Sequence, residues 1–248
     1  MNSSPHFILF EQLPLLYGRV PKVANTSIKA TLSRLLKAPP EEGVRSTTDA
    51  FWSKSTHGET RLITPTQARS FRGTHFSFSF VRNPFDRLVS AYNNKILELD
   101  DVTKPMQEMG LRHKMPFEEF LEQIVSTQDD QLDVHLLPQT NILCIDGELI
   151  PSFVGQIEQI NLHWNELQSW LRREGLPELG SLPQKNMRRG DDRSDLGHYY
   201  ANGRIIELVK QRYGDDINLF YGDMTIEQLI NGETTYSSPA KHPWLALN

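Results

Sequence analysis

The segment that joins an expected strand at residues 15–20 to an expected helix carries a lysine and two hydroxyl side chains. Backbone N–H groups at the start of a helix attract phosphate, and the charge of a lysine and the hydroxyl donors add to that attraction. The segment is not a Walker A sequence, because the pattern Gly-x-x-x-x-Gly-Lys-Ser/Thr does not occur in it. The residue types predict a phosphate-binding loop made by Lys22, Val23, Ala24, Asn25, Thr26 and Ser27.

A second segment, residues 80–92, follows the same order of strand, proline-containing loop and helix. Arg82 comes at the end of the expected strand, and Ser90 lies two turns into the expected helix. Arginine binds phosphate through charge-assisted hydrogen bonds, so Arg82 and Ser90 can reach one phosphate beside the first loop.

The apolar spacing predicts the elements that position these side chains. A helix that Thr26 or Ser27 can cap follows the first loop, and residues 75–81 alternate aromatic and small side chains as a strand does. Residues 41–70 are polar and turn-rich and read as an excursion that forms a lid or an acceptor-binding loop. Further helices are expected around 85–96, 117–125, 160–171, 205–213 and 226–230, and short buried strands at 141–145 and 153–155.

Strands that alternate with helices predict an α/β fold with a mainly parallel sheet flanked by helices. In such a sheet, ligands bind beyond the carboxyl ends of the strands, where both candidate loops are expected. The chain contains no internal repeat and no clear domain boundary. We therefore expect a single domain over residues 1–233 and a loosely ordered tail over 234–248.

The net charge is −5, which argues against broad binding of nucleic acid because phosphate contacts need a basic surface. Two stretches without acidic residues nevertheless stand in this acidic chain, one from residue 12 to 40 and one from 60 to 85. They are either solvated surface or a pocket for a small polyanion. Their basic residues are Arg19, Lys22, Lys29, Arg34 and Lys37, then Arg61, Arg69, Arg72 and Arg82.

No apolar run approaches the roughly 20 residues that span a bilayer, and no secretory signal is visible, so no integral membrane segment is expected. The lone cysteine, Cys144, cannot form an intramolecular disulfide, which favours a reducing compartment. We expect a cytoplasmic protein, with a lumenal catalytic fragment as the alternative.

Residues 21–29 and 80–95 resemble the two nucleotide-binding signatures of the sulfotransferases that use 3′-phosphoadenosine-5′-phosphosulfate (PAPS), specifically the membrane-type carbohydrate sulfotransferase family. That family reads near Pro-Lys-Val-Ala-Cys-Thr-Asn-Trp-Lys and Phe-Val-Arg-x-Pro-Phe-x-Arg-Leu-Val-Ser-Ala-Tyr. The resemblance implies a P-loop-like sulfotransferase fold in which Lys22, Thr26 and Ser27 hold the 5′-phosphosulfate. It also implies that Arg82 and Ser90 hold the 3′-phosphate.

Residues 133–141 resemble the family's Asp-x-His-Trp-x-Pro-Gln segment. A hydroxyl acceptor loses its proton as it attacks sulfur, and imidazole accepts a proton near neutral pH, so we expect His135 to be the general base. Asp133 would orient it, and His75, at the start of a strand, is the reserve candidate. The alternative is a histidine that only serves packing.

The sequence departs from the family pattern at Asn25, where the family commonly has Cys, and the cysteine-rich continuation is reduced to Cys144, expected to be buried. Arg87 is expected at the helix surface. Arg188, Arg189 and Arg204 are candidates for binding an anion or are surface residues.

We therefore expect an O-sulfotransferase that moves a sulfuryl group from PAPS to a hydroxyl, of a small molecule or an oligosaccharide, and releases 3′-phosphoadenosine-5′-phosphate (PAP). Lys22 would stabilise the charge on the leaving phosphate, and no metal-ligand cluster is evident. Two alternatives are a phosphate-loop kinase that uses ATP and magnesium, and a nucleotide-binding module without catalysis. The oligomeric state leaves no trace in the sequence.

Overall fold

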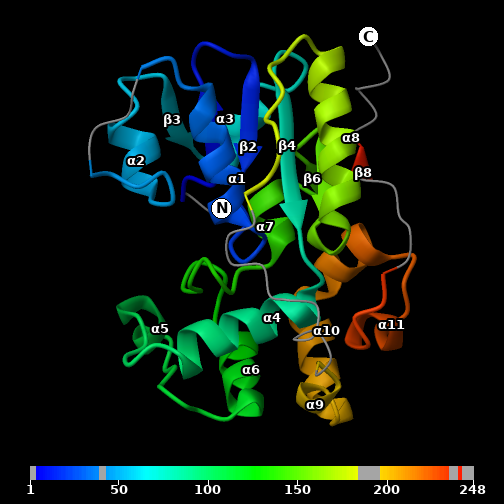
Figure 1. Cartoon of the computed structure of the whole chain (residues 1–248). Coiled ribbons are helices and arrows are strands. Elements are labelled where there is room, and N and C mark those ends of the chain that lie inside the picture. Colours follow the sequence, from blue (N-terminus) through cyan, green and yellow to red (C-terminus); the bar gives the residue numbers. More distant parts are fainter. Residues whose placement is uncertain (1–3, 39–42, 184–195, 235–239, 242–248) are drawn as a thin grey trace. The chain divides into compact units, whose positions relative to one another are not determined.

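The computed structural model describes residues 4–38, 43–183, 196–234 and 240–241 (Figure 1). Contacts between these residues form two compact units. The sheet unit contains the described residues of 4–81, 141–183 and 240–241, and the helical unit those of 82–140 and 196–234. The chain leaves the sheet unit between Val81 and Arg82, within the second predicted motif. The expected single domain stays a prediction.

The sheet unit is built on a mixed six-stranded sheet with the order β3-β1-β2-β4-β7-β8. Its three central strands, β2, β4 and β7, are parallel, whereas β1, β3 and β8 pair antiparallel at the edges. The predicted α/β class with parallel strands and flanking helices is confirmed. The strands of the sheet are β1 (Phe7–Phe10), β2 (Leu15–Gly18), β3 (Thr60–Ile63), β4 (Phe76–Val81), β7 (Phe153–Gln156) and β8 (Ala240–Lys241).

The register of β2 against β4 places the ends of both strands at one edge of the sheet. Leu15 lies opposite Phe76 and Gly18 opposite Ser79, and the Ser79 hydroxyl donates a 2.8 Å hydrogen bond to the Gly18 carbonyl. All six residues of β4 are buried, which explains the aromatic and small side chains of this segment. The loops that follow β2 and β4 therefore leave the sheet at the same edge, as the sequence predicts.

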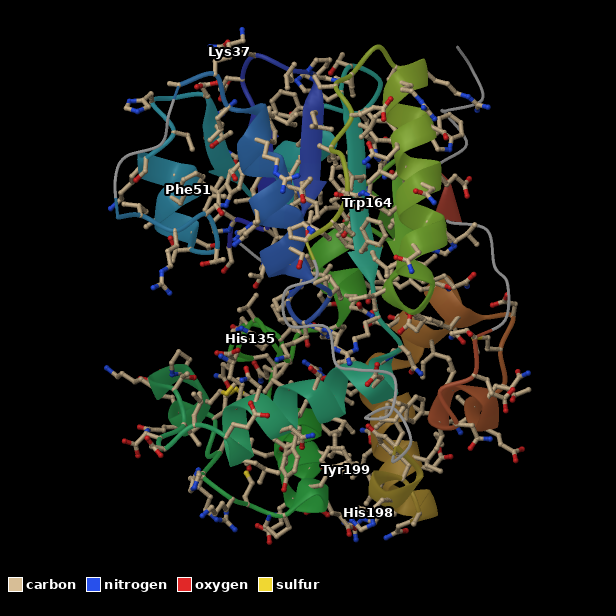
Figure 2. All side chains as sticks on the ribbon, viewed as in Figure 1. Lys37, Phe51, His135, Trp164, His198 and Tyr199 are labelled. Carbon is tan, nitrogen blue, oxygen red and sulfur yellow. The ribbon has the colours of Figure 1, made fainter. Side chains whose placement is uncertain are left out.

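Helices cover this sheet (Figure 1). On α8, Trp164 packs on Phe80 of β4 with ring centroids 5.9 Å apart, and Figure 2 shows its side chain between this helix and the sheet. Gly155 of β7 leaves room for Phe80, since a Cβ there would lie 2.4 Å from that ring. The helices of this unit are α1 (Asn25–Leu32), the 3-10 turn Ser33–Leu35, α2 (Asp49–Lys54), α3 (Pro65–Arg69), the 3-10 turn Ile157–Gln159 and α8 (Ile160–Arg173).

The helical unit is held together by apolar stripes. The predicted stripe of α4 is buried along its whole length and continues to Ile96, and that of α6 is buried at Phe117, Phe120, Leu121 and Ile124. Tyr92 packs against Phe117 and Phe120 at ring distances of 5.0 and 5.2 Å. Its elements are α4 (Pro84–Tyr92), the π-helix Asn93–Leu97, α5 (Lys104–Glu108), α6 (Phe117–Ser126), α9 (Leu196–Tyr199), α10 (Gly203–Tyr221) and α11 (Ile226–Ile230).

The interpretation of residues 41–70 as an irregular excursion is wrong for its described part, residues 43–70. This stretch contains α2, α3 and the strand β3, which pairs with β1. Phe51 and Trp52 are buried, and Figure 2 shows Phe51 on α2. The region looked polar because β3 is a short edge strand with two of its four residues outside the core, so its pattern is weak.

Three element boundaries also differ from expectation. Residues 139–143 form the short helix α7 (Gln139–Leu143), and the strand that follows, β5 (Cys144–Ile145), pairs only with β6 (Glu148–Leu149) in a hairpin where Cys144 is half-buried. Helix α10 bends at Tyr213 and continues beyond Gly214, because Ile217, Phe220 and Tyr221 bury the next turns. Within the tail, Ala240–Lys241 pairs with β7. Among the described helices, none is both long and apolar enough to cross a membrane.

Candidate active site

The predicted phosphate loop has an unusual backbone. Lys22 and Ala24 both adopt positive φ angles, 69° and 57°, while Val23 between them does not. Alternation of this kind turns successive N–H groups toward one side, as in the anion-binding loops called nests. The first helical hydrogen bonds of α1 run from the N–H groups of Ser27 and Ile28 to the Ala24 carbonyl, so those of Asn25 and Thr26 precede the hydrogen-bonded helix.

Neighbouring side chains hold the loop in this shape. Val23 is fully buried, and the Tyr17 hydroxyl of β2 donates a 3.1 Å hydrogen bond to the side-chain oxygen of Asn25. Burial raises the pKa of Tyr17 far above its usual value, so it remains a donor. The side-chain oxygen of Asn25 thus helps to hold the loop against β2.

The prediction that Thr26 or Ser27 caps α1 is wrong. The N-cap residue is Ala24, in the left-handed conformation, and its methyl side chain cannot accept a hydrogen bond. Thr26 is half-buried and Ser27 is 2% exposed, both in the first turn of the helix. The backbone conformation of Ala24 therefore starts the helix without a side-chain cap. The hydroxyl groups of Thr26 and Ser27 lie in the first turn of α1.

Two of the basic residues near the loop pair with a carboxylate inside the sheet unit. Arg19 and Lys29 are buried, and both bind the Asp49 carboxylate, Lys29 at 3.0 Å. Burial would raise the pKa of Asp49, but the charges of Arg19 and Lys29 outweigh it and hold that pKa below its usual value. This cluster ties both ends of the loop to the start of α2. The interpretation of the whole first basic stretch as a polyanion pocket is wrong for these two residues.

Three of the four arginines in the second basic stretch pair with acidic side chains distant in sequence. Arg61 pairs with Glu11, Arg69 with Asp146 and Glu148, and Arg72 with Glu148. These acids lie outside the stretch in sequence but contact it in the folded chain. Counting charges along the sequence therefore missed them.

Arg82 is the first residue of the helical unit, and its side chain is oriented by the helix that follows it, α4. Its Nε lies 2.8 Å from Asp86 Oδ2, an i,i+4 ion pair, and both side chains are mostly buried. Asn83 caps α4 through a 3.0 Å hydrogen bond from the Phe85 N–H, and Pro84 occupies the first turn. Ser90, two turns along α4, is 8% exposed. The sequence predicted this strand–loop–helix order correctly.

Gln139 holds the backbone of Arg82, a contact that the sequence analysis missed. Its amide oxygen accepts from the Arg82 N–H at 2.9 Å, and its amide nitrogen donates to the Arg82 carbonyl at 2.8 Å. Gln139 is fully buried. Its place in the Pro-Gln segment gave a signal, but the partner lies 57 residues away in sequence.

Asp133 and His135 form a hydrogen-bonded pair on the segment before α7 (Figure 2). Nδ1 of His135 lies 2.7 Å from Asp133 Oδ1, which also accepts from the His135 N–H at 2.9 Å. Burial would raise the pKa of Asp133, but the hydrogen bonds and charge of His135, with the charge of Lys95, hold it below its usual value. An ionised carboxylate only accepts, so Nδ1 carries the proton and Nε2 is the basic nitrogen.

The reserve candidate, His75, lies at the opposite edge of the sheet from the phosphate loop. It precedes β4 and packs edge-to-face against Phe71, whereas the loop begins after β2. The parallel register of β2 and β4 puts about 20 Å of strand between these edges at roughly 3.3 Å per residue. This position argues against His75 as the base.

The remaining candidates have structural surroundings. Arg87 is 2% exposed and donates to the Leu137 carbonyl at 2.8 Å, so its expected surface position is wrong. Tyr92 is a core residue. Arg204 pairs on the surface with Glu118 and Glu122 of α6. Arg188 and Arg189 lie outside the described residues.

A model of the Sulfotransferase family matches residues 5–222, a range that contains every predicted site residue. The chain belongs to the sulfotransferase family. This assignment confirms the family that the sequence motifs predict and fits the strand–loop–helix between β2 and α1.

Individual members of this sulfotransferase family align over most of the chain. Carbohydrate sulfotransferase 14 of Homo sapiens is 27% identical over 230 residues, which cover 87% of this chain and 59% of that protein. The Mus musculus protein of the same name is 27% identical over 232 residues, with the same coverage. Carbohydrate sulfotransferase 11 of Rattus norvegicus is 34% identical over 102 residues, 39% of this chain and 28% of that protein.

The chain spans about three-fifths of the length of the carbohydrate sulfotransferase 14 proteins. No solved structure matches it significantly. The structure joins Asp133 to His135 and Arg82 to Gln139 within the helical unit, and it gathers the residues from Lys22 to Ser27 on one loop of the sheet unit.

Proposed function

We infer that this protein is a PAPS-dependent O-sulfotransferase that moves a sulfuryl group to a carbohydrate hydroxyl and releases PAP. The family membership supports sulfuryl transfer, and the names of the relatives support a carbohydrate acceptor. The observation that carries the proposal is the loop between β2 and α1. Its alternating backbone turns N–H groups toward an anion at a helix start without a Walker A sequence.

The residues present fit the two phosphate ends of PAPS. The backbone from Lys22 to Ser27, with the Lys22 ammonium group, would hold the 5′-phosphosulfate, and the terminal nitrogens of Arg82 with the Ser90 hydroxyl would hold the 3′-phosphate. Arg82 and the loop follow neighbouring parallel strands, β4 and β2, at the same sheet edge.

The side chains also suit the chemistry of transfer. As the acceptor oxygen forms a bond to sulfur, the bond from sulfur to the bridging oxygen of PAPS breaks, and that oxygen gains negative charge. Lys22 would stabilise this charge, and His135 Nε2 would take the acceptor proton while Asp133 supports the imidazolium. PAP and the sulfated carbohydrate then leave.

A thermal-shift comparison of PAP, ADP and ATP tests the nucleotide assignment. A ligand that binds only the folded state stabilises it by RT ln(1 + [L]/Kd), so PAP should raise the melting temperature more than ADP or ATP does. Arg82→Ala should weaken PAP binding by about 1.5–3 kcal/mol, the range of a hydrogen bond to a charged group.

Arg204→Ala is the matched control, because this arginine pairs with α6 at the surface. Its PAP affinity should equal that of the wild type. Equal shifts for PAP and ADP would remove the support for a 3′-phosphate site, and a magnesium-dependent preference for ATP would favour a kinase.

A further inference from the structure

We propose that Gln139 and Asp216 are positioning residues that set Arg82 for the 3′-phosphate, an inference that rests on the proposed function. Both side chains are fully buried in the helical unit, and neither lies in the two nucleotide signatures. They connect three separate segments of the chain: the turn before α4, the start of α7 and the middle of α10.

The contact between Gln139 and Arg82 fixes both polar groups of one residue. The Gln139 amide accepts from the N–H and donates to the carbonyl, at 2.9 and 2.8 Å, so the backbone of Arg82 has one orientation. Asp86 then fixes the side chain through Nε at 2.8 Å. A guanidinium whose backbone and Nε are both held loses little freedom when a phosphate binds its terminal nitrogens.

Asp216 holds Gln139 in turn. Its carboxylate accepts from the Gln139 N–H, the Thr140 N–H and the Thr140 hydroxyl, at 2.8, 2.8 and 2.9 Å. It therefore accepts hydrogen bonds from the first two N–H groups of α7, as a capping side chain does. A fully buried carboxylate is costly unless such hydrogen bonds compensate it.

The bend of α10 places Asp216 next to this segment. Tyr213 departs from helical φ and ψ, at −120° and 20°, and its hydroxyl donates to the Leu136 carbonyl at 2.6 Å. Arg87 donates to the next carbonyl, that of Leu137. The segment that carries His135 and Gln139 is thus attached to α4 and α10 at successive residues, so Arg82 is held by a connected network.

A second buried glutamine makes the same kind of contact with backbone outside the proposed site, and it serves as a matched control. Gln168 of α8, in the sheet unit, accepts from the Leu179 N–H and donates to the Gly180 carbonyl, both at 2.8 Å. It is also buried, at 8% exposure. Gln168→Ala removes the same two kinds of hydrogen bond as Gln139→Ala, but far from any predicted site residue in sequence.

The test is the ratio of the dissociation constants of AMP and PAP, measured by titration calorimetry on the full chain together with the melting temperature. This ratio reports the 3′-phosphate alone, because AMP lacks it. Gln139→Ala and Asp216→Asn should lower the ratio about tenfold and leave AMP affinity within twofold. Gln168→Ala should lower the melting temperature and leave the ratio unchanged.

Thr140→Val keeps the shape of the side chain and removes one hydrogen bond to Asp216, so it provides a folded variant if the others unfold. It should lower the ratio about threefold. In the Arg82→Ala background, Gln139→Ala should change the ratio no further.

A normal ratio in Gln139→Ala or Thr140→Val, beside a lowered one in Arg82→Ala, would overturn the positioning role and leave the proposed function standing. A normal ratio in Arg82→Ala itself would instead overturn the 3′-phosphate assignment.

Discussion

The hydrogen bond between Asp133 and His135 determines which ring nitrogen of His135 can accept a proton. With Nδ1 donating to the carboxylate, Nε2 is the only ring nitrogen that can take a proton. His135→Ala should therefore lower turnover by roughly 10²–10⁴-fold, the usual contribution of a general base, with PAP affinity and melting temperature nearly unchanged. Steady-state kinetics and a melt on the same preparation check this.

If His135 only served packing, His135→Ala would lower the melting temperature and spare turnover in the folded fraction. His75→Ala is the comparison, because His75 lies at the opposite sheet edge. Its turnover should match that of the wild type.

Lys22 is expected to act on the leaving group more than on the bound nucleotide. Lys22→Ala should reduce turnover by about 10²–10³-fold and weaken PAP binding by less, because its charge matters most as the bridging oxygen becomes negative. Turnover with PAPS and calorimetry with PAP separate the two effects. Equal losses in both would make Lys22 an anchor for the ground state.

His6 should make the fold sensitive to acid. Burial, together with the charge of Arg19 and against that of Asp49, lowers the pKa of His6 to about 4, from 6.5 in an unfolded chain. The unfolded state then binds the proton first, so stability is full above pH 6.5 and falls as the pH drops toward 4, by about 3 kcal/mol.

In His6→Gln the melting temperature should fall less between pH 7 and pH 4.5 than in the wild type. His198→Gln, at an exposed histidine labelled in Figure 2, should behave like the wild type. An equal fall of the melting temperature between pH 7 and pH 4.5 in the wild type and His6→Gln would contradict this role of His6.

At the scale of elements, the left-handed conformation of the N-cap residue Ala24 predicts which substitutions the phosphate loop tolerates. A β-branched residue fits this conformation poorly, so Ala24→Val should weaken PAP binding at least tenfold, whereas Ala24→Gly should retain it. At Ala30, inside α1, glycine should be the worse substitution. Ala30→Gly should lower the melting temperature more than Ala30→Val, because glycine costs about 1 kcal/mol in a helix and valine less. Calorimetry and melting curves for the four variants check both positions.

Equal PAP affinity in Ala24→Val and Ala24→Gly would show that the loop does not need its conformation to bind the nucleotide.

The sequence predicts an element well when its apolar pattern is long and does not depend on contacts from distant segments. The stripes of α4, α6 and α8 and the alternation in β4 were found from periodicity, and β2 and β7 were predicted as short buried runs. Edge strand β3 and the helix α7 were missed, because one has a weak pattern and the other depends on a cap from Asp216. Contacts across long stretches of sequence decide such cases.

The candidate site divides in the same way. Residue types and spacing predicted the phosphate loop and Arg82, and the resemblance to the sulfotransferase family predicted His135 as the base. The pairing of Arg19 and Lys29 with Asp49, and the clamp by Gln139, needed the folded chain.

At the scale of the whole molecule, the family match extends over residues 5–222 and includes both units. It therefore covers the loop of the sheet unit and the Arg82, Gln139 and Asp216 network of the helical unit.

The most direct measurement is transfer of labelled sulfuryl from PAPS to a panel of carbohydrates, with PAP release followed in parallel and with ATP and magnesium as the comparison. A PAPS-dependent sulfotransferase should give a labelled carbohydrate and one PAP for each transfer, with no phosphorylated product from ATP. PAP binding without transfer to any carbohydrate, phenol or alcohol, or phosphorylation from ATP in place of sulfation, would contradict it.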